Sequence, residues 1–166
     1  MARRCHRRAI CVSGADRIRS GAPHTRRCAQ DRRTEADLGD GIIPATEHLR
    51  SGVRLALGSD FPVEEATPLA GLYAAITRQD RTGAPEAGWY PEQRMTIDEA
   101  LAAFTTAPAY AAFEEATRGR LAPGFAADVT VIDAPGKSVA ALSPAHLLAA
   151  KVALTLVDGA LVFEAK

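Results

Sequence analysis

Cysteine is scarce in this 166-residue sequence and is confined to one end of it. The three cysteines, Cys5, Cys11 and Cys28, all lie within the first 40 residues. Because their number is odd and the rest of the chain has none, a disulfide framework is not expected.

Long apolar runs are also missing. No stretch approaches the roughly 20 apolar residues that a bilayer-spanning helix needs. The apolar segment 9–13 is too short for the core of a secretion signal. We therefore expect a cytoplasmic protein with no membrane partner.

The sequence has no net charge, with 20 basic and 20 acidic residues, so nucleic acid is not an expected partner of the whole chain. The charges are unevenly distributed, however. Residues 1–40 carry ten arginines against five acids, whereas the remaining residues carry ten basic groups against fifteen acids. The two parts therefore need separate explanations.

The middle of the chain predicts a buried strand followed by helices. Residues 53–57 form a short apolar run between Gly52 and Gly58, as expected of a buried strand. Thr67-Pro68 is a typical helix start. Thr96 and Glu99 have the spacing of a capping box at the start of a second helix, and a third helix is expected over 108–115.

The last third of the chain predicts a small β unit. Strands are expected over 128–133, 152–157 and 160–164, with a short helix from Ser143 to Ala150. Asp158-Gly159 joins the last two strands and is a strong hairpin signal. The whole pattern indicates an α/β fold joined to strands.

Asp60 is the candidate chemical residue. It directly follows the predicted buried strand, which itself precedes a helix, and in a (β/α) barrel this end of a strand carries the active site. A carboxylate there can ligate a divalent metal or accept a proton. An aspartate after a strand is also a common turn or capping residue, so position alone leaves both roles open.

Several motifs follow in order after residue 49. They are Gly58-Ser59-Asp60-Phe61-Pro62-Val63-Glu64, Gly71-Leu72-Tyr73-Ala74-Ala75, Gly88-Trp89-Tyr90-Pro91-Glu92-Gln93, Met95-Thr96, Glu99-Ala100-Leu101, and the segments 107–113, 119–133 and 155–159. Over residues 49–166 they resemble amidohydrolase family 3, a group that includes N-substituted formamide deformylases.

The resemblance implies the C-terminal part of a metal-dependent-hydrolase (β/α)8 barrel, with strands of a flanking composite β-sandwich. It places the last barrel strand and following helices in residues 41–117 and the sandwich portion in 118–166. Residues 1–40 fall outside it as a leader rich in arginine and cysteine.

The resemblance also implies a site. The family's motif aspartate is a metal ligand or general base and maps onto Asp60. Glu64 also lies in the motif, but it can equally be interpreted as a solvated loop carboxylate without a role in the site. The intact enzyme would hydrolyse a C–N bond of a small-molecule amide or formamide. Zn²⁺-activated hydroxide would attack the carbonyl and Asp60 would handle the proton.

The histidines that the family uses as further ligands are not matched. The family places a His-x-His pair on its first strand, and none of the four histidines here forms one. His48 and His146 are interpreted as structural. His24 stands upstream of Asp60 at a ligand-like separation, but its neighbours do not match the family.

Zinc takes three or four ligands, so Asp60 alone would not hold it stably. We therefore predict a truncated hydrolase that is inactive alone. The alternative is a non-catalytic remnant or interaction module, which would self-associate through an exposed barrel edge.

By the resemblance, residues 1–40 should hold the seventh barrel strand, but they show no helical or strand periodicity. Their composition is typical of GC-rich coding DNA read out of frame, which favours a frameshift or a misplaced start. Three other interpretations stay open: a targeting segment interrupted by acids, a disordered tail, and a zinc knuckle on a nucleic-acid-binding arm. The knuckle would use Cys5, Cys11, His24 and Cys28, with the first pair spaced more widely than usual.

Overall fold

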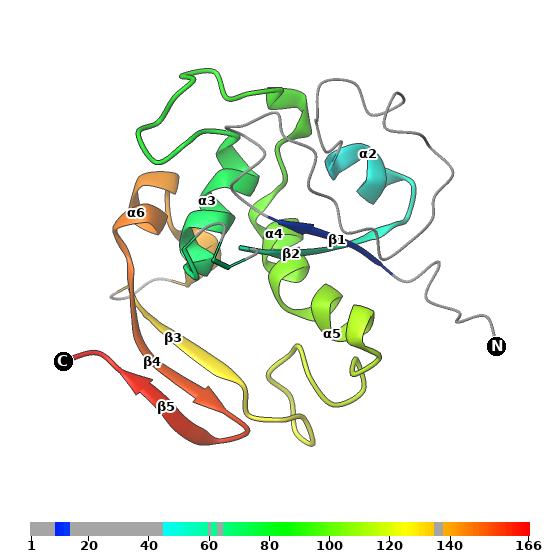
Figure 1. Ribbon diagram of the computed structural model, residues 1–166, viewed down its shortest axis with the longest axis vertical. Coiled ribbons are helices and arrows are strands. Elements are labelled where there is room, and N and C mark those ends of the chain that lie inside the picture. Colours follow the sequence, from blue (N-terminus) through cyan, green and yellow to red (C-terminus); the bar gives the residue numbers. More distant parts are fainter. Residues whose placement is uncertain (1–8, 14–44, 60, 63–64, 135–137) are drawn as a thin grey trace.

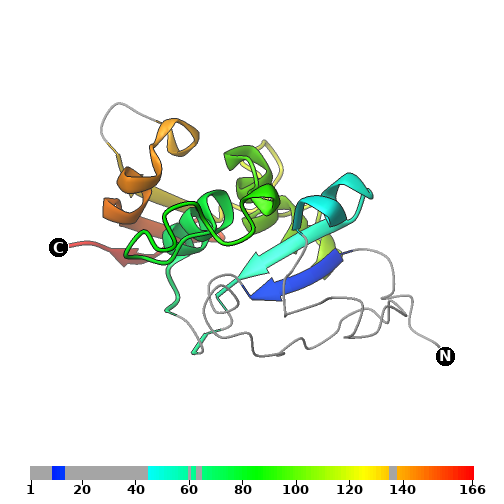
Figure 2. The same ribbon diagram turned by 90° about the horizontal axis from the view of Figure 1, so that it is seen from above.

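The computed structural model describes residues 9–13, 45–59, 61–62, 65–134 and 138–166. Two parallel strands, β1 (Ala9–Ser13) and β2 (Arg54–Gly58), form one sheet. Their register pairs Ala9 with Arg54 and Ser13 with Gly58, so both strands end at the same edge. Figure 2 shows the helices on one side of this strand pair.

β1 corrects one expectation. The sequence predicts no strand within residues 1–40, yet Ala9–Ser13 pairs along its whole length with β2. The segment lies among arginines and turn residues with no surrounding periodicity, and its pairing partner lies some 45 positions further along the chain. Parallel strands are joined by a long crossover, so the sequence near β1 contains no turn signal that would predict the pairing. The division of the chain at residues 40 and 117 stays a prediction.

Four helices pack near β2: α2 (Ala45–Arg50), α3 (Pro68–Thr77), α4 (Ile97–Phe104) and α5 (Thr106–Ala112) (Figure 1). The helix expected over 108–115 begins at Thr106 and ends at Ala112, and the φ of 66° at the next residue, Phe113, is left-handed. Pro108 is tolerated because it falls in the first turn, where its missing N–H has no helical acceptor.

The two predicted threonine caps behave differently. Thr96 accepts a hydrogen bond from the Glu99 backbone N–H, and the Glu99 carboxylate accepts one from the Thr96 N–H at 2.7 Å. The capping box is therefore confirmed. Thr67 occupies the cap of α3 with extended backbone angles, but its side chain makes no capping hydrogen bond.

This contrast predicts that replacing threonine by alanine destabilises the protein more at position 96 than at position 67. Thr96→Ala should lower the free energy of unfolding by about 1 kcal/mol, because the Glu99 backbone N–H loses the hydroxyl that accepts its hydrogen bond. Thr67→Ala should lower the free energy of unfolding by only about a few tenths of a kcal/mol, because Thr67 makes no capping hydrogen bond. Urea unfolding of both variants measures the difference. Equal losses would contradict the assignment of the capping box.

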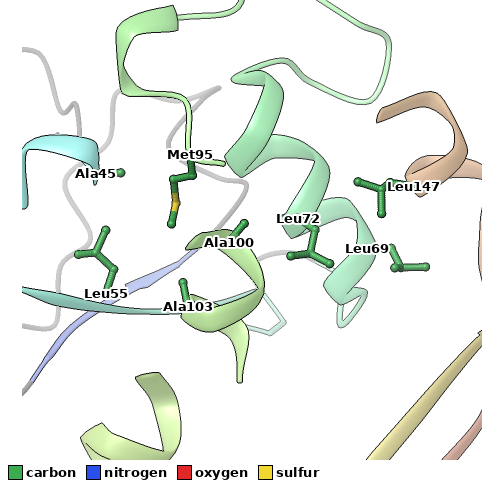
Figure 3. Close-up of a cluster of buried hydrophobic side chains, with 8 residues drawn as sticks. All are labelled: Ala45, Leu55, Leu69, Leu72, Met95, Ala100, Ala103 and Leu147. Carbon is green, nitrogen blue, oxygen red and sulfur yellow. The ribbon is translucent and has the colours of Figure 1, made fainter. Parts of the chain in front are cut away.

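The core lies between β2 and the helices. Its buried side chains meet from five elements and the segment before α4 (Figure 3), and they are Ala45, Leu55, Leu69, Leu72, Met95, Ala100, Ala103 and Leu147. Ala100 and Ala103 are 0% and 2% exposed, so their small side chains let α4 approach β2 closely. Beside this core, the Arg54 guanidinium lies 3.9 Å from the ring centroid of Tyr110, which connects α5 to β2.

The C-terminal sheet is antiparallel, in the order β3 (Val129–Asp133), β4 (Lys151–Val157) and β5 (Ala160–Glu164). The hairpin at Asp158-Gly159 is confirmed, with positive φ at both residues as a type I′ turn requires. Before β4, η3 (Val139–Ala141) and α6 (Pro144–Ala149) lead back to the core, where Leu147 is fully buried.

A polar network joins the segment after α5 to this hairpin. The Arg118 guanidinium contacts the Asp128 carboxylate at 2.5 Å, and the Asp158 backbone N–H donates to the same carboxylate at 2.8 Å. That backbone hydrogen bond, followed by the Arg118 contact, lowers the pKa of Asp128 despite partial desolvation. The Asp128 carboxylate thus ties the start of the predicted sandwich portion to the hairpin between β4 and β5. Among the described residues, no helix is long and apolar enough to cross a membrane.

Candidate functional site

The candidate site lies where β2 ends. Leu55 and Ala56 of β2 are buried, while Gly58 and Ser59 are partly exposed at the edge shared with β1. Asp60, the predicted catalytic and metal-binding residue, lies outside the described residues, and so does Glu64. Their neighbours Phe61, at 70% exposure, and Pro62 form a turn open to solvent.

A pocket of about 210 Å³ opens beside this turn. Its wall combines the end of β2, the start of α3, one residue of α4 and one from the loop after α3. The lining residues are Gly58, Ser59, Glu65, Ala66, Thr67, Pro68, Ala70, Gly71, Arg81 and Phe104. Most of this wall is apolar, and its two charged groups are Glu65 and Arg81.

Glu65 and Arg81, which both line the pocket, form an ion pair with 2.8 Å between Nη1 of Arg81 and Oε2 of Glu65. Their side chains are 73% and 47% exposed. Ion pairs this exposed to water contribute little net stability. The pair is therefore easily exchanged for another charged partner of either residue.

A turn built on Asp80 positions Arg81. Oδ1 of Asp80 accepts from the Thr82 backbone N–H at 2.8 Å and from the Ala84 N–H at 3.1 Å. This side-chain capping of the backbone is a common way to hold a tight turn. The backbone that carries Arg81 is thereby fixed, while its side chain extends to the pocket.

The loop that contains this turn, residues 79–91, is anchored by two other arginines. Nε of Arg78 donates to the Trp89 carbonyl at 3.0 Å, and Nε of Arg94 donates to the Thr77 carbonyl at 3.0 Å. Burial lowers the pKa of Arg78, and the negative charge of Glu92 partly offsets this shift. Arginine nevertheless keeps its charge in proteins. These side chains satisfy backbone carbonyls and are structural.

The structure assigns local roles to two histidines. Nδ1 of His146 lies 2.6 Å from the hydroxyl of Ser143, the N-cap residue of α6, which agrees with a structural role for this histidine. His48 lies in α2, and its carbonyl accepts hydrogen bonds from Ser51 and Val53. His6, His24, Cys5 and Cys28 lie outside the described residues, and Cys11 lies in β1.

Within the part of the chain that the structure describes, no three His, Cys, Asp or Glu side chains come together as a metal site. The described residues therefore do not fit a zinc centre on their own.

The sequence profile of the amidohydrolase family matches residues 13–163, nearly the whole chain. The chain belongs to the amidohydrolase family. The predicted family is thus confirmed, and the match begins at the last residue of β1.

Two curated relatives of this amidohydrolase segment show how much of a family member it represents. It is 32% identical over 123 residues to the N-substituted formamide deformylase of Arthrobacter pascens, covering 74% of this chain and 22% of that protein. It is 28% identical over 116 residues to the putative amidohydrolase YtcJ of Bacillus subtilis, covering 70% of this chain and 21% of that protein. The chain therefore spans about a fifth of the length of these relatives.

Solved structures agree on the fold. An amidohydrolase from Thermotoga maritima superposes with a TM-score of 0.52 at 26% identity, over 80% of this chain and 29% of that one. Guanine deaminase from E. coli gives a TM-score of 0.57 at 20% identity, over 78% and 32% of the two chains. An adenosine deaminase from Xanthomonas campestris, described with bound zinc, gives 0.56 at 19% identity, over 78% and 30%. The predicted α/β fold, the C-terminal part of an amidohydrolase barrel, is confirmed.

Sequence reasoning missed Glu65 and Arg81. The residues Asp80-Arg81-Thr82-Gly83 carry a recognisable turn signal, but nothing in it indicates a partner 16 positions earlier. Only the folded chain brings the two residues to one pocket.

Proposed function

We propose that this chain is the C-terminal segment of a metal-dependent hydrolase that cleaves a C–N bond in a small amide or formamide. The observation that carries the proposal is the Gly58–Glu64 motif at the carboxyl end of β2, a parallel strand with a buried centre. In barrel enzymes this end of the strands holds the catalytic groups. The relative from Arthrobacter pascens, a formamide deformylase, supports the substrate class.

In this proposal Asp60 serves as a metal ligand or as the carboxylate that accepts a proton. A bound zinc ion would supply an ionised water near neutral pH. The other ligands would have to come from barrel strands beyond this segment, because one carboxylate falls short of the three protein ligands of a catalytic zinc site. We therefore propose that the chain is inactive alone.

Zinc binding and hydrolysis by the purified chain test the proposal. We expect no hydrolysis of N-formyl or anilide substrates, and weak zinc binding that does not change in Asp60→Asn. A variant with Cys5→Ser, His24→Asn and Cys28→Ser should lose whatever zinc these side chains bind, and it leaves β1 in place. Robust turnover by the unmodified chain that disappears in Asp60→Asn would show that the segment is a complete enzyme.

A second candidate function, an interaction module, is favoured by exposed apolar surface. In the described part of the chain, β1 and β2 pair only with each other, so each has an open edge. The C-terminal sheet adds large exposed side chains, at 41–59% exposure: Val131, Val157, Leu161, Val162 and Phe163. Such edges and patches promote association.

Analytical ultracentrifugation of the purified chain measures this association. We expect its average mass to rise with concentration between the micromolar and the hundred-micromolar range. If the C-terminal sheet causes the association, Leu161→Thr together with Phe163→Thr should reduce the rise in average mass. If the open edges of β1 and β2 cause it, the rise should be unchanged in this double variant. A monodisperse monomer with one cooperative thermal transition would exclude this second function.

A further inference from the structure

Much of the wall of the pocket at the end of β2 is apolar. Phe104 of α4 lies directly on Gly71 of α3, where an added Cβ would stand 2.5 Å from Cζ of the ring. Pro68 and Ala70 continue this wall along the start of α3. These side chains offer contact area but no hydrogen bonds, so they would hold the apolar body of a ligand.

Arg81 is the cation of this pocket wall, and its geometry suits an anion. A guanidinium presents five N–H donors in a planar fork that matches a carboxylate in a bidentate manner. The Asp80 turn holds the backbone of Arg81 in place. The side chain is 47% exposed, whereas the side chain of its partner Glu65 is 73% exposed.

We propose that Arg81 binds the carboxylate of a small ligand whose apolar part lies against Phe104 and Pro68. Glu65 occupies Arg81 when the pocket holds no ligand, and a ligand carboxylate replaces it at the guanidinium. The identification of this ligand as a substrate rests on the proposed function, because Gly58 and Ser59, which directly precede Asp60 in the sequence, line the pocket. The segment then selects amides that carry a carboxylate on an apolar group.

Benzoate and benzamide are the probes, because they have the same ring and differ in charge. Binding to the full 166-residue chain is measured by NMR titration, without metal and without turnover. We expect benzoate to bind more tightly than benzamide, and Arg81→Gln to weaken benzoate binding roughly tenfold or more. Arg81→Lys should recover only part of that loss. Benzamide binding should be the same in all variants.

Two further variants distinguish recognition of benzoate by Arg81 from a general effect of the protein's charge on benzoate binding. Glu65→Gln should tighten benzoate binding several-fold, because the competing carboxylate is removed. Arg118→Gln removes another ion-paired arginine, which lies outside the pocket, and should leave the benzoate affinity unchanged. Circular dichroism checks that each variant is folded.

Equal benzoate affinity in Arg81→Gln and the parent chain, or no saturable benzoate binding by the parent, would overturn the proposal. Either result leaves the role of Asp60 untouched, since these titrations involve no chemistry.

Discussion

Asp60→Asn is expected to lower C–N bond hydrolysis by roughly 10²–10⁴-fold once the barrel around it is complete. A suitable protein is a chimera in which residues 49–166 replace the matching C-terminal segment of the Arthrobacter pascens formamide deformylase. Asparagine keeps the shape of aspartate but carries no charge and cannot accept a proton. Both proposed roles of Asp60 are therefore removed with little change in volume.

The measurement is kcat for a formamide substrate, together with bound zinc by elemental analysis. A fall in kcat with zinc retained indicates the proton-accepting role, and a parallel loss of zinc indicates the ligand role. Asp98→Asn is the matched control, because Asp98 is an exposed carboxylate in the first turn of α4. Glu64→Gln tests the other acid of the motif. If kcat in Asp60→Asn stays within a few-fold of the parent chimera, Asp60 has no catalytic role.

Gly88→Ala should destabilise the chain by about 3 kcal/mol, a large share of the stability of an ordinary domain. Gly88 has a φ of 76°, which L-residues rarely adopt. An added Cβ would also collide with the Thr77 carbonyl and stand 2.9 Å from Nη2 of Arg94. Both are parts of the contacts that hold the loop 79–91 to α3, and a backbone carbonyl has little room to move.

Gly83→Ala is the matched control for this prediction. Gly83 lies in the same loop with a φ of 83°, but an added Cβ would meet nothing within 4 Å. Its substitution should cost only the backbone strain, about 1 kcal/mol. The difference between the two variants in urea unfolding isolates the collision. Equal losses would show that Gly88 is required for its φ alone.

Other glycines show why sequence alone does not reveal such requirements. Gly71, in the middle of α3, has ordinary helical angles and is needed because Phe104 lies on it. Gly124 has a φ of 86° and open space around it. The turn at Gly124 is signalled in the sequence by the preceding Pro123. The need for a glycine at position 71 comes from Phe104, far along the chain.

Elements whose stabilising contacts are local could be predicted from the sequence. The Thr96–Glu99 capping box joins residues three apart, and the Asp158-Gly159 turn joins adjacent strands, so both could be predicted and both are confirmed. The motifs of residues 49–166 likewise identified the family and its α/β fold.

Tertiary structure alone decided the features that depend on distant partners. β1 is a strand because β2 supplies its hydrogen bonds, and Leu147 is fully buried because α6 returns to α3. Arg81 reaches the pocket only because the chain after α3 folds back toward the end of β2. The physical reason is the same in each case: burial and pairing energies belong to contacts between segments, and a local stretch of sequence specifies only its own half of each contact.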